Sequence, residues 1–409
     1  MTVSIRQLGA VLVSLLAATA LLAFSTVAWS EPPEDLVDEG PGGSQYAAGE
    51  LIVTYEDEAP EQEVASLDEE VGAEVGEDLS EMDAKVLEFP EVKDERSEEV
   101  REEDLEQAKR ELERNPAVES VYYNYVRTAS FTPRDPLFRR QYGLKKAEFE
   151  EAWNRTRGRG ARVAIVDSGA MTSHIDLRRK IVAQYDFRNN NSTVEDLHGH
   201  GTHVAGTAAA RTSNRKGVAG GCPGCRLIIA KALGSELSGY DSDIAEGITW
   251  SADAGAKVIN LSLGGPGEKS VLKNAIDYAT ARGAVVVAAA GNGGTAGPVY
   301  PAAYPNVLAV AATGRYDGRD SFYTTGSWID VSAPGFDIVS TVPGGYAVKS
   351  GTSMSSPHVA ALAGLLAAQG RGPGSIRNRI VRSAVDLGPR GHDPYYGAGR
   401  IDAERATRR

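Results

Sequence analysis

The sequence is poor in cysteine and in aromatic side chains. Only Cys222 and Cys225 occur among 409 residues, and Phe, Trp and Tyr together make up 7%. Two cysteines alone cannot build a structural zinc site. Glycine is abundant, with 45 residues, and 42% of the chain is hydrophobic. This composition suits an α/β enzyme with many tight turns better than a fibrous or disordered chain.

The chain also lacks any long basic run, and its charges are unevenly divided. Residues 31–130 carry 32 Asp and Glu against 8 Lys and Arg, a net charge of −24. Residues 131–409 carry 24 against 34, a net charge of +10. Because the basic residues are scattered and form no nucleic-acid motif, no nucleic-acid partner is expected. The split suggests two parts that attract each other, although the acidic part could simply be solvated.

The first 30 residues have the pattern of a secretory signal. Arg6 precedes an apolar stretch, and Ala28-Trp29-Ser30 offers small residues for cleavage. An uncleaved anchor is the alternative, because the stretch from Leu8 to Ala28 could span a bilayer. The polar segment EPPEDLVDEG that follows favours cleavage, so we expect a secreted, extracellular protein with no remaining membrane contact. Export makes a Cys222–Cys225 disulfide the leading prediction, with a reduced or redox-active pair as the alternative.

Two folded parts follow from the patterns along the chain. Residues 31–48 are acidic and rich in Pro and Gly, which predicts a mobile linker. A strand at 49–55, a helix at 61–72, a strand at 84–90, a helix ending at Asn115-Pro116 and a strand at 119–127 predict a β-α-β-α-β unit. In 131–409, short apolar strands alternate with helical stretches, which predicts a parallel sheet covered by helices on both faces.

Three segments carry the residue types of nucleophilic catalysis. VAIVDSG ends a buried strand in Asp167, HGTH places His200 at a helix start, and GTSMSSPHVAALAG places Ser353 at the start of an apolar helix. A serine hydroxyl needs a base such as histidine, which a buried carboxylate can orient. The helix start would also offer unpaired N–H groups to an oxyanion. Pro357 is expected to be tolerated there because first-turn N–H groups need no helical partner.

These segments resemble the three signature segments of the subtilase family of serine proteases. The resemblance continues through VINLSLGG, VVAAAGN, YPAAYPNVLAVAAT and GSWIDVSAPG, and is greatest to thermitase-like members. It implies a subtilisin-like α/β fold over 131–409. Residues 49–130 resemble the inhibitory propeptide of the family, which implies a small ferredoxin-like α+β domain. The resemblance makes Ser353 the nucleophile, His200 the general base, Asp167 the orienting carboxylate and Asn292 a side-chain oxyanion donor. It makes His203 structural, and we expect the same of His174.

The resemblance also assigns the substrate-binding residues. Ser262, Leu263, Gly264 and Gly265 match the edge segment that pairs with an extended peptide. Val299 falls where the floor of the primary pocket should lie, and Tyr240 and Asp241 fall near a more distant subsite. No Asp or Glu occurs from 289 to 305, which speaks against cleavage at basic pairs. The YPAAYP match implies a cis bond between Tyr300 and Pro301.

A structural calcium ion is the expected cofactor. Asp135, Asp176 and Asn214 match the strong calcium site of thermitase-like enzymes, and all are oxygen donors of the kind that a hard cation prefers. The backbone carbonyls of Arg211, Lys216 and Val218 would complete the shell. A second site near DFRNNNSTVED is doubtful, because asparagines stand where carboxylates are expected.

Together these patterns predict a secreted, calcium-stabilised serine endopeptidase that acts on polypeptides. We expect a monomer made as a self-processing zymogen, in which 31–130 inhibits the enzyme until a cut between about Tyr125 and Phe131. The alternative is a catalytically inactive subtilase-fold binding or scaffold protein, which the intact triad disfavours.

Overall fold

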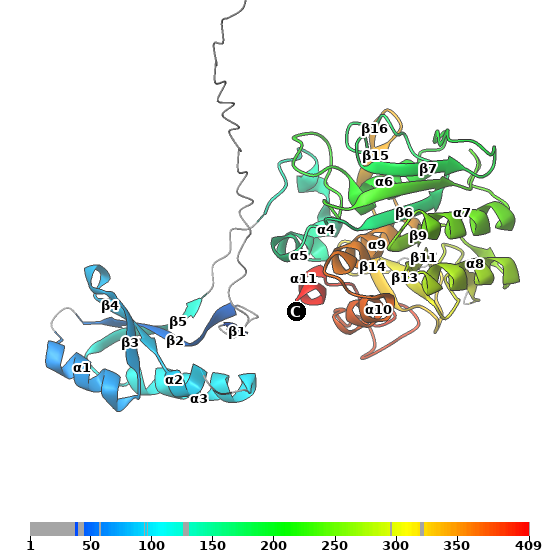
Figure 1. Ribbon diagram of the computed structural model, residues 1–409. Helices are drawn as coiled ribbons and strands as arrows, with labels where there is room; N and C mark the ends of the chain where they lie inside the picture. Colours follow the sequence, from blue (N-terminus) through cyan, green and yellow to red (C-terminus); the bar gives the residue numbers. More distant parts are fainter. Residues whose placement is uncertain are drawn as a thin grey trace, which may run out of the picture. The chain divides into compact units, whose positions relative to one another are not determined.

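The computed structural model describes residues 37–39, 45–56, 59–93, 95, 97–125, 131–294, 297–319 and 323–408. The expected signal peptide and the expected processing segment after Tyr125 lie outside these residues. Within the described ranges, no helix is long and apolar enough to cross a membrane. The chain divides into two compact units, Met1–Thr128 and Ala129–Arg409 (Figure 1). Each unit has a hydrophobic core of its own.

The first unit is an antiparallel sheet with helices packed against it (Figure 1). Strand β5 pairs with β2, β2 with β4, and β4 with β3, while β1 forms a hairpin with the start of β2. This order confirms the ferredoxin-like prediction. The elements are β1 (Val37–Glu39), β2 (Gln45–Tyr55), α1 (Glu61–Glu70), β3 (Glu74–Leu79), η3 (Ser80–Met82), β4 (Ala84–Glu88), α2 (Pro90–Lys93), α3 (Glu98–Leu112) and β5 (Val118–Tyr125).

Two details of the predicted first unit are wrong. The β-α-β-α-β prediction omits β3, whose residues are almost all exposed and show no apolar alternation, so that the sequence carries no strand signal there. The predicted linker at 31–48 is too long, because β1 and the start of β2 lie inside it. Tyr46 and Ala48 are buried, and the Tyr46 ring lies 4.6 Å from that of Tyr123. Aromatic packing therefore orders residues whose surroundings look like linker.

The second unit is built on a parallel sheet of seven strands in the order β14-β13-β11-β9-β6-β8-β7. Two short antiparallel pairs, β10 with β12 and β15 with β16, lie outside it. The elements are η4 (Phe138–Arg140), α4 (Tyr142–Lys146), α5 (Phe149–Arg155), β6 (Arg162–Asp167), β7 (Ile181–Asp186), α6 (His200–Ala209), β8 (Arg226–Lys231), α7 (Asp241–Asp253), β9 (Val258–Leu261), β10 (Gly265–Pro266), α8 (Ser270–Ala281), β11 (Val285–Ala289), β12 (Val299–Tyr300), β13 (Val307–Thr313), β14 (Val331–Pro334), β15 (Ile338–Val342), β16 (Gly345–Lys349), α9 (Thr352–Ala368), α10 (Pro373–Arg382) and α11 (Ala403–Thr407).

Both faces of this sheet are covered, as predicted. Along β6, Val163 and Ile165 join the core cluster that contains residues of α6 and α9, whereas Ala164 and Val166 join the cluster of α7 and α8. Successive side chains of a strand point to opposite faces, so each strand must be apolar throughout. This explains why the strands appear in the sequence as continuous apolar runs.

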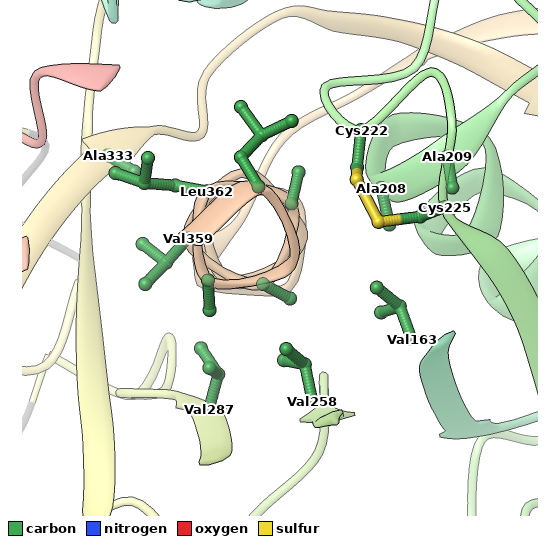
Figure 2. Packing of buried hydrophobic residues seen from close by; sticks show 14 of the residues in the cluster. Val163, Ala208, Ala209, Cys222, Cys225, Val258, Val287, Ala333, Val359 and Leu362 are labelled. Atoms are coloured by element: carbon green, nitrogen blue, oxygen red, sulfur yellow. A yellow bond between two sulfur atoms is a disulfide. The ribbon is translucent and has the colours of Figure 1, made fainter. Parts of the chain in front are cut away.

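Helix α9 runs through the larger core cluster. It is apolar on all sides and buried from Met354 to Leu366, as expected of a helix surrounded by protein. Figure 2 shows Val359 and Leu362 of this helix among side chains from the sheet, from α6 and from the disulfide loop. Ser353, in the first turn of α9, is thus carried by a rigid, buried helix.

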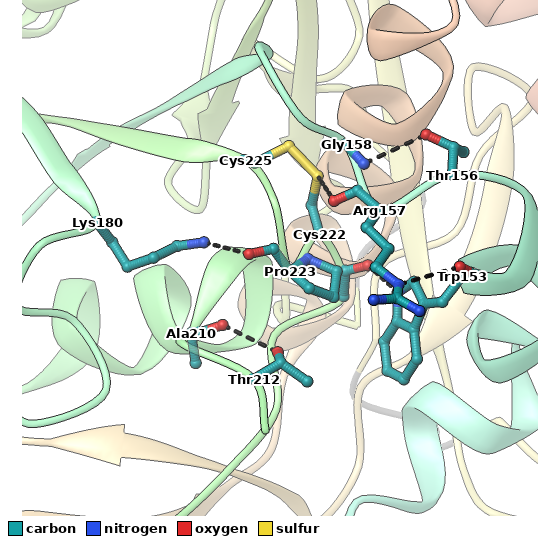
Figure 3. The surroundings of a disulfide bond; sticks show 11 residues. Trp153, Thr156, Arg157, Gly158, Lys180, Ala210, Thr212, Cys222, Pro223 and Cys225 are labelled. Carbon is teal, nitrogen blue, oxygen red and sulfur yellow. Dashed lines mark hydrogen bonds between the residues drawn. A yellow bond between two sulfur atoms is a disulfide. The ribbon is translucent and has the colours of Figure 1, made fainter. Parts of the chain in front are cut away.

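Cys222 and Cys225 are joined, which confirms the predicted disulfide (Figure 3). Both cysteines are fully buried. A Cβ added to Gly158 would lie 2.0 Å from the sulfur of Cys222, and one added to Gly364 would lie 2.7 Å from the sulfur of Cys225, so the disulfide has room only beside glycine. The loop is also clamped by Lys180, whose Nζ donates to the carbonyl of Pro223 at 2.6 Å. Burial, together with the positive charges of Arg226 and Arg211, lowers the pKa of Lys180 to about 7. The loop is therefore part of the packed core.

Candidate active site

The sheet brings the candidate residues to one edge. Asp167 ends β6, Ser262 follows β9, and Asn292 follows β11, so all three lie at the carboxyl ends of parallel strands. From β6 the chain continues to β7 and β8 on one side and then to β9 on the other. Such a change of direction between neighbouring strands is where parallel α/β sheets form their binding crevices.

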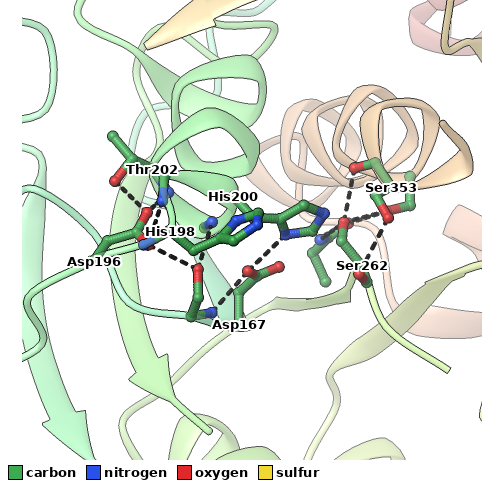
Figure 4. A network of polar contacts seen from close by, with 12 residues as sticks. Asp167, Asp196, His198, His200, Thr202, Ser262 and Ser353 are labelled. Carbon is green, nitrogen blue, oxygen red and sulfur yellow. Dashed lines mark hydrogen bonds and ion pairs between the residues drawn. The ribbon is translucent and has the colours of Figure 1, made fainter. Parts of the chain in front are cut away.

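Asp167 and His200 form a buried hydrogen-bonded pair (Figure 4). The Nδ1 atom of His200 lies 2.8 Å from Oδ1 of Asp167, which also accepts the N–H of Ser168 at 2.7 Å. His200 Nε2 has no hydrogen-bond partner within the described residues. With Nδ1 directed to a carboxylate, the neutral ring carries its proton there and leaves a lone pair on Nε2.

The surroundings of His200 act on its pKa in opposite directions. Burial disfavours the charged ring, but the charge of Asp167 and its hydrogen bond outweigh burial, so that the pKa is raised above its usual value. The positive charge of Lys349 acts to lower the pKa, and Asp196 acts to raise it. The imidazolium form is therefore stabilised at this position.

Ser353 is the second residue of α9, and its surroundings are fixed by polar side chains at the end of β9. Its hydroxyl donates to the carbonyl of Ser262 at 3.2 Å, and the hydroxyl of Ser262 donates back to the carbonyl of Ser353 at 2.9 Å. Asn260 and Ser356 complete this network with three further contacts of 2.9 Å. In the view of Figure 4, the His200 ring points from Asp167 toward Ser262 and Ser353.

The expected reason for tolerating Pro357 is wrong in its detail. Pro357 is the sixth residue of α9, beyond the first turn, and the N–H that it lacks would have bonded to the carbonyl of Ser353. The Ser262 hydroxyl takes the place of that donor. A side chain from another element thus satisfies the acceptor that proline leaves open.

Asn292 is held in one orientation beside the start of α9. Its Oδ1 accepts the backbone N–H of Thr352 at 2.9 Å and the Thr352 hydroxyl at 3.1 Å. Its Nδ2 has no acceptor within the described residues and lies 3.3 Å from the position that a Cβ on Gly351 would occupy. The amide donor is thus oriented at the helix start and remains available.

The predicted edge segment and pocket residue lie together. Gly265 of β10 pairs with Tyr300 of β12, and a Cβ on Gly264 would approach Val299 Cγ1 to 2.8 Å. A Cβ on Gly291 would approach the other methyl group of Val299 to 3.2 Å. Val299 therefore lies between the two glycine-containing segments. The Tyr300–Pro301 peptide is cis, as predicted.

Comparison with known proteins decides the family. The subtilase family profile matches residues 158–399, and the profile of the fervidolysin N-terminal prodomain matches residues 32–124. The chain belongs to the subtilase family.

Named relatives agree with this assignment. The chain is 48% identical to thermitase of Thermoactinomyces vulgaris over 279 residues, which is 68% of this chain and 99% of thermitase. It is 42% identical to a thermophilic serine proteinase of Bacillus sp. (strain AK1) over 367 residues, 88% of each chain. A solved protease structure from Pseudoalteromonas arctica matches 68% of this chain and 99% of its own, with a TM-score of 0.62 and 32% identity. The protein is therefore a subtilisin-type serine protease with an N-terminal prodomain.

The other histidines of this subtilase have different surroundings. His203 Nε2 contacts the carbonyl of Ile338 at 2.9 Å, and burial lowers its pKa to about 3. His358 is buried in α9 against the carbonyl of Met354, and burial lowers its pKa to about 4. His174 contacts the carbonyl of Gly345, while His198 is exposed two residues before His200. Only His200 pairs with a carboxylate among the histidines described.

The predicted calcium residues come together in the peptidase unit. Asp135 accepts the N–H groups of Ser213 and Asn214, and Asp176 accepts the side-chain amide of Asn214 at 2.7 Å. The backbone of the other three predicted residues contacts the same side chains. The N–H of Arg211 donates to the carbonyl of Asp176, and the N–H of Val218 donates to Asp176 Oδ2. The N–H of Lys216 donates to Asn214 Oδ1.

The chemistry of this set fits a hard cation. Asp135 and Asp176 are buried, and within the described residues neither forms an ion pair with Lys, Arg or His. Burial raises the pKa of Asp135, and the charge of Asp176 raises it further. No cluster of three or more Asp, Glu, His or Cys side chains suited to a metal occurs in the ranges described, so carbonyl and amide oxygens would have to supply the other ligands.

The segment DFRNNNSTVED, where a second calcium site is doubtful, is held by hydrogen bonds within its own loop. Asp186 is buried and accepts the N–H groups of Arg188 and Asn189 and the side-chain amide of Asn189. Lys231 lies 4.0 Å from the same carboxylate.

Asp196 is a buried carboxylate that sequence reasoning missed. It accepts hydrogen bonds from the Ser168 hydroxyl, from the N–H groups of His198 and Gly199, and from Thr202 through both N–H and hydroxyl (Figure 4). It therefore ties the residue after Asp167 to the turn that begins α6 at His200. Its position four residues before His200, at a helix start, is the one signal the sequence offered.

Proposed function

We propose that the protein is a secreted, calcium-stabilised endopeptidase that cleaves peptide bonds through an acyl-enzyme and is made as a self-processing zymogen. The observation that carries this proposal is the buried Asp167–His200 pair at the edge of the sheet, with Nε2 available and Ser353 at the start of α9. The raised pKa of His200 supports a role in accepting a proton.

In the proposed mechanism, the Ser353 hydroxyl turns from the Ser262 carbonyl to His200 Nε2. As Ser353 Oγ attacks the peptide carbonyl, its proton passes to Nε2, and Asp167 stabilises the imidazolium that forms. His200 then gives this proton to the leaving amine. Water repeats the sequence on the acyl-enzyme, with His200 again the base.

The developing oxyanion would be stabilised by Asn292 Nδ2 and by the Ser353 N–H at the helix start. Asn292 supports this role because Thr352 fixes its Oδ1 and therefore the direction of its Nδ2. Fixed donors of this kind act on charge that appears only in the transition state.

Peptide binding is assigned to Ser262, Leu263, Gly264 and Gly265, with Val299 at the floor of the primary pocket. The glycines leave backbone groups accessible for pairing with an extended chain. Asp135, Asp176 and Asn214, with the carbonyls of Arg211, Lys216 and Val218, would hold calcium. The bound ion would supply positive charge to the two buried carboxylates.

Replacing Ser353 by Ala tests this function. We expect Ser353→Ala to abolish peptide hydrolysis and to leave the precursor uncut, because the nucleophile is lost while α9 keeps its shape. The parent should react with an organofluorophosphate at Ser353, and the variant should not. An unlabelled parent would favour an inactive subtilase-fold scaffold, and normal processing of purified Ser353→Ala would contradict self-cleavage.

A further inference from the structure

A cleft at the C-terminal end of the peptidase unit gathers positive charge. It has a volume of about 800 Å³ and lies between α10, α11 and the turn after α9. Five arginines line it, together with three neutral polar side chains that include Ser375 and Asn378. The arginines are Arg371, Arg379, Arg382, Arg405 and Arg408.

Among the described residues, two of these arginines pair with acidic side chains beside the cleft. Arg405 pairs with Asp402 at 3.4 Å, and Arg408 pairs with Glu404 at 2.8 Å. Within the described residues, Arg371 donates only to neutral oxygens, those of the Gln369 side-chain amide and the Arg408 carbonyl.

Arg382 is exposed and makes no hydrogen bond or ion pair within the described residues. Helix ends account for part of the cluster, because Arg379 donates to the carbonyls of Ala406 and Arg408. Arg382 also stands in the last turn of α10, where a cation suits the helix dipole, but its side chain donates to no carbonyl among the described residues. Burial lowers the pKa of Arg379, and the charges of Arg371 and Arg382 lower it further, as expected where cations crowd together.

We propose that this cleft binds a polyanion carrying several phosphoryl or sulfate groups. Guanidinium groups present paired N–H donors that match tetrahedral oxyanions, and several of them here face one concavity. Ser375 and Asn378 add neutral donors for the remaining oxygens. An acidic helix is a poorer occupant, because its carboxylates are spread along a rod rather than collected in one cleft.

The cleft is remote from the proposed catalytic residues. Ser353 lies at the start of α9 and Arg371 lies three residues beyond its end. A helix of 17 residues is roughly 25 Å long at 1.5 Å per residue. Occupation of the cleft should therefore leave peptide hydrolysis unchanged.

The test compares two charge reversals in the full chain. Arg382→Glu alters the cleft, and Arg178→Glu, at an exposed arginine outside it, is the matched control. Sucrose octasulfate and tripolyphosphate are titrated by calorimetry at constant ionic strength, with inorganic sulfate as the single-anion comparison. In a second arm, a peptide of residues 98–112 replaces the polyanions. Processed parent and variants are assayed for peptide hydrolysis.

We expect the parent and Arg178→Glu to bind at least one polyanion equally, and Arg382→Glu to bind it about ten-fold more weakly, the scale of a lost charge-assisted hydrogen bond. Hydrolysis should be the same in all three. Binding of sucrose octasulfate alone would identify sulfate esters as the ligand class, and binding of tripolyphosphate alone would identify phosphoryl groups. No binding by the parent, or equal weakening by both reversals, would overturn the proposal. Tighter binding of the acidic peptide would overturn it in favour of a protein segment.

Discussion

At the scale of single residues, His200 is held between charges of opposite sign. Asp167 raises its pKa and Lys349 lowers it. Because the proposed base must be neutral to accept a proton, activity should fall as the pH drops below the pKa of His200. The acid limb of the pH profile should therefore respond to each charge separately.

We expect Asp167→Asn to lower kcat by about 10⁴, the scale known for the equivalent change in another triad protease. It should also move the acid limb to lower pH, because the ring loses the carboxylate that favours its charged form. Lys349→Gln should move the limb the other way, to higher pH. The measurement is kcat/KM against pH, with Asp253→Asn as a surface control. Shifts of the same sign in both variants would contradict this electrostatic account.

Val299 sets the second prediction at this scale. Its methyl groups lie between Gly264 and Gly291, so we expect small apolar P1 residues to be preferred over Phe and Tyr. Val299→Gly should raise kcat/KM for Phe relative to Ala by about ten-fold or more, because a pocket discriminates by roughly 1–3 kcal/mol per methylene.

A P1 substrate library measures this preference. Val182→Gly, at a half-exposed strand valine in β7, controls for loss of a valine as such. Dominance of Phe and Tyr in the parent, unchanged by Val299→Gly, would refute the role of Val299.

Residue identities could be predicted from the sequence where a motif carries them, and not where the fold creates the contact. Asp167, His200, Ser353 and Asn292 stand in motifs. The two reciprocal hydrogen bonds between Ser262 and Ser353 form because β9 ends beside α9, and no local sequence pattern encodes that contact. The five hydrogen bonds to Asp196 likewise join segments that only the folded turn brings together.

At the scale of elements, buried strands were predictable and exposed ones were not. The apolar runs of β6, β11 and β13 follow from burial on both faces of the sheet. Strand β3 is exposed along almost its whole length and has no such run, because backbone pairing with β4 alone defines it. Periodicity reports burial, so an edge strand without burial leaves no trace in it.

The loops that carry Asp135, Asp176 and Asn214 should depend on calcium. In a Ser353→Ala background, we expect a chelator to lower the thermal unfolding midpoint by roughly 5–10 °C. Saturation at about 100 times Kd contributes about 2.7 kcal/mol, and each kcal/mol shifts the midpoint of such a chain by roughly 2–4 °C. Differential scanning calorimetry with and without calcium measures this shift.

Asp176→Asn should abolish the difference between the unfolding midpoints measured with and without calcium. Asp186→Asn should leave that difference unchanged. The second variant is the matched control, because Asp186 is also buried but is satisfied by its own loop. A shift that survives Asp176→Asn and disappears in Asp186→Asn would place calcium in the other loop.

At the scale of the whole molecule, the two units differ in sign and are folded around separate cores. The charge of 31–130 is −24 and that of 131–409 is +10. Each unit was predictable as a unit, because hydrophobic periodicity is a property of each segment. Which surface of one unit meets the other is not encoded by any such pattern, so the inhibitory role of the prodomain stays a prediction.

We expect isolated 31–130 to inhibit the processed enzyme, because its tail, YYNYVRTAS, would be the product of the proposed cut and would occupy the peptide-binding edge. Opposite charges speed and strengthen association. Salt limits the distance over which they act to about 10 Å at 0.1 M and to about 3 Å at 1 M. The inhibition constant, measured from low to high ionic strength, should therefore rise markedly. A fragment with Glu102, Glu103 and Asp104 replaced by their amides should inhibit less at low salt and vary less with salt. If inhibition does not change with salt, attraction between the units plays no part, and if the fragment does not inhibit at all, the prodomain is not an inhibitor.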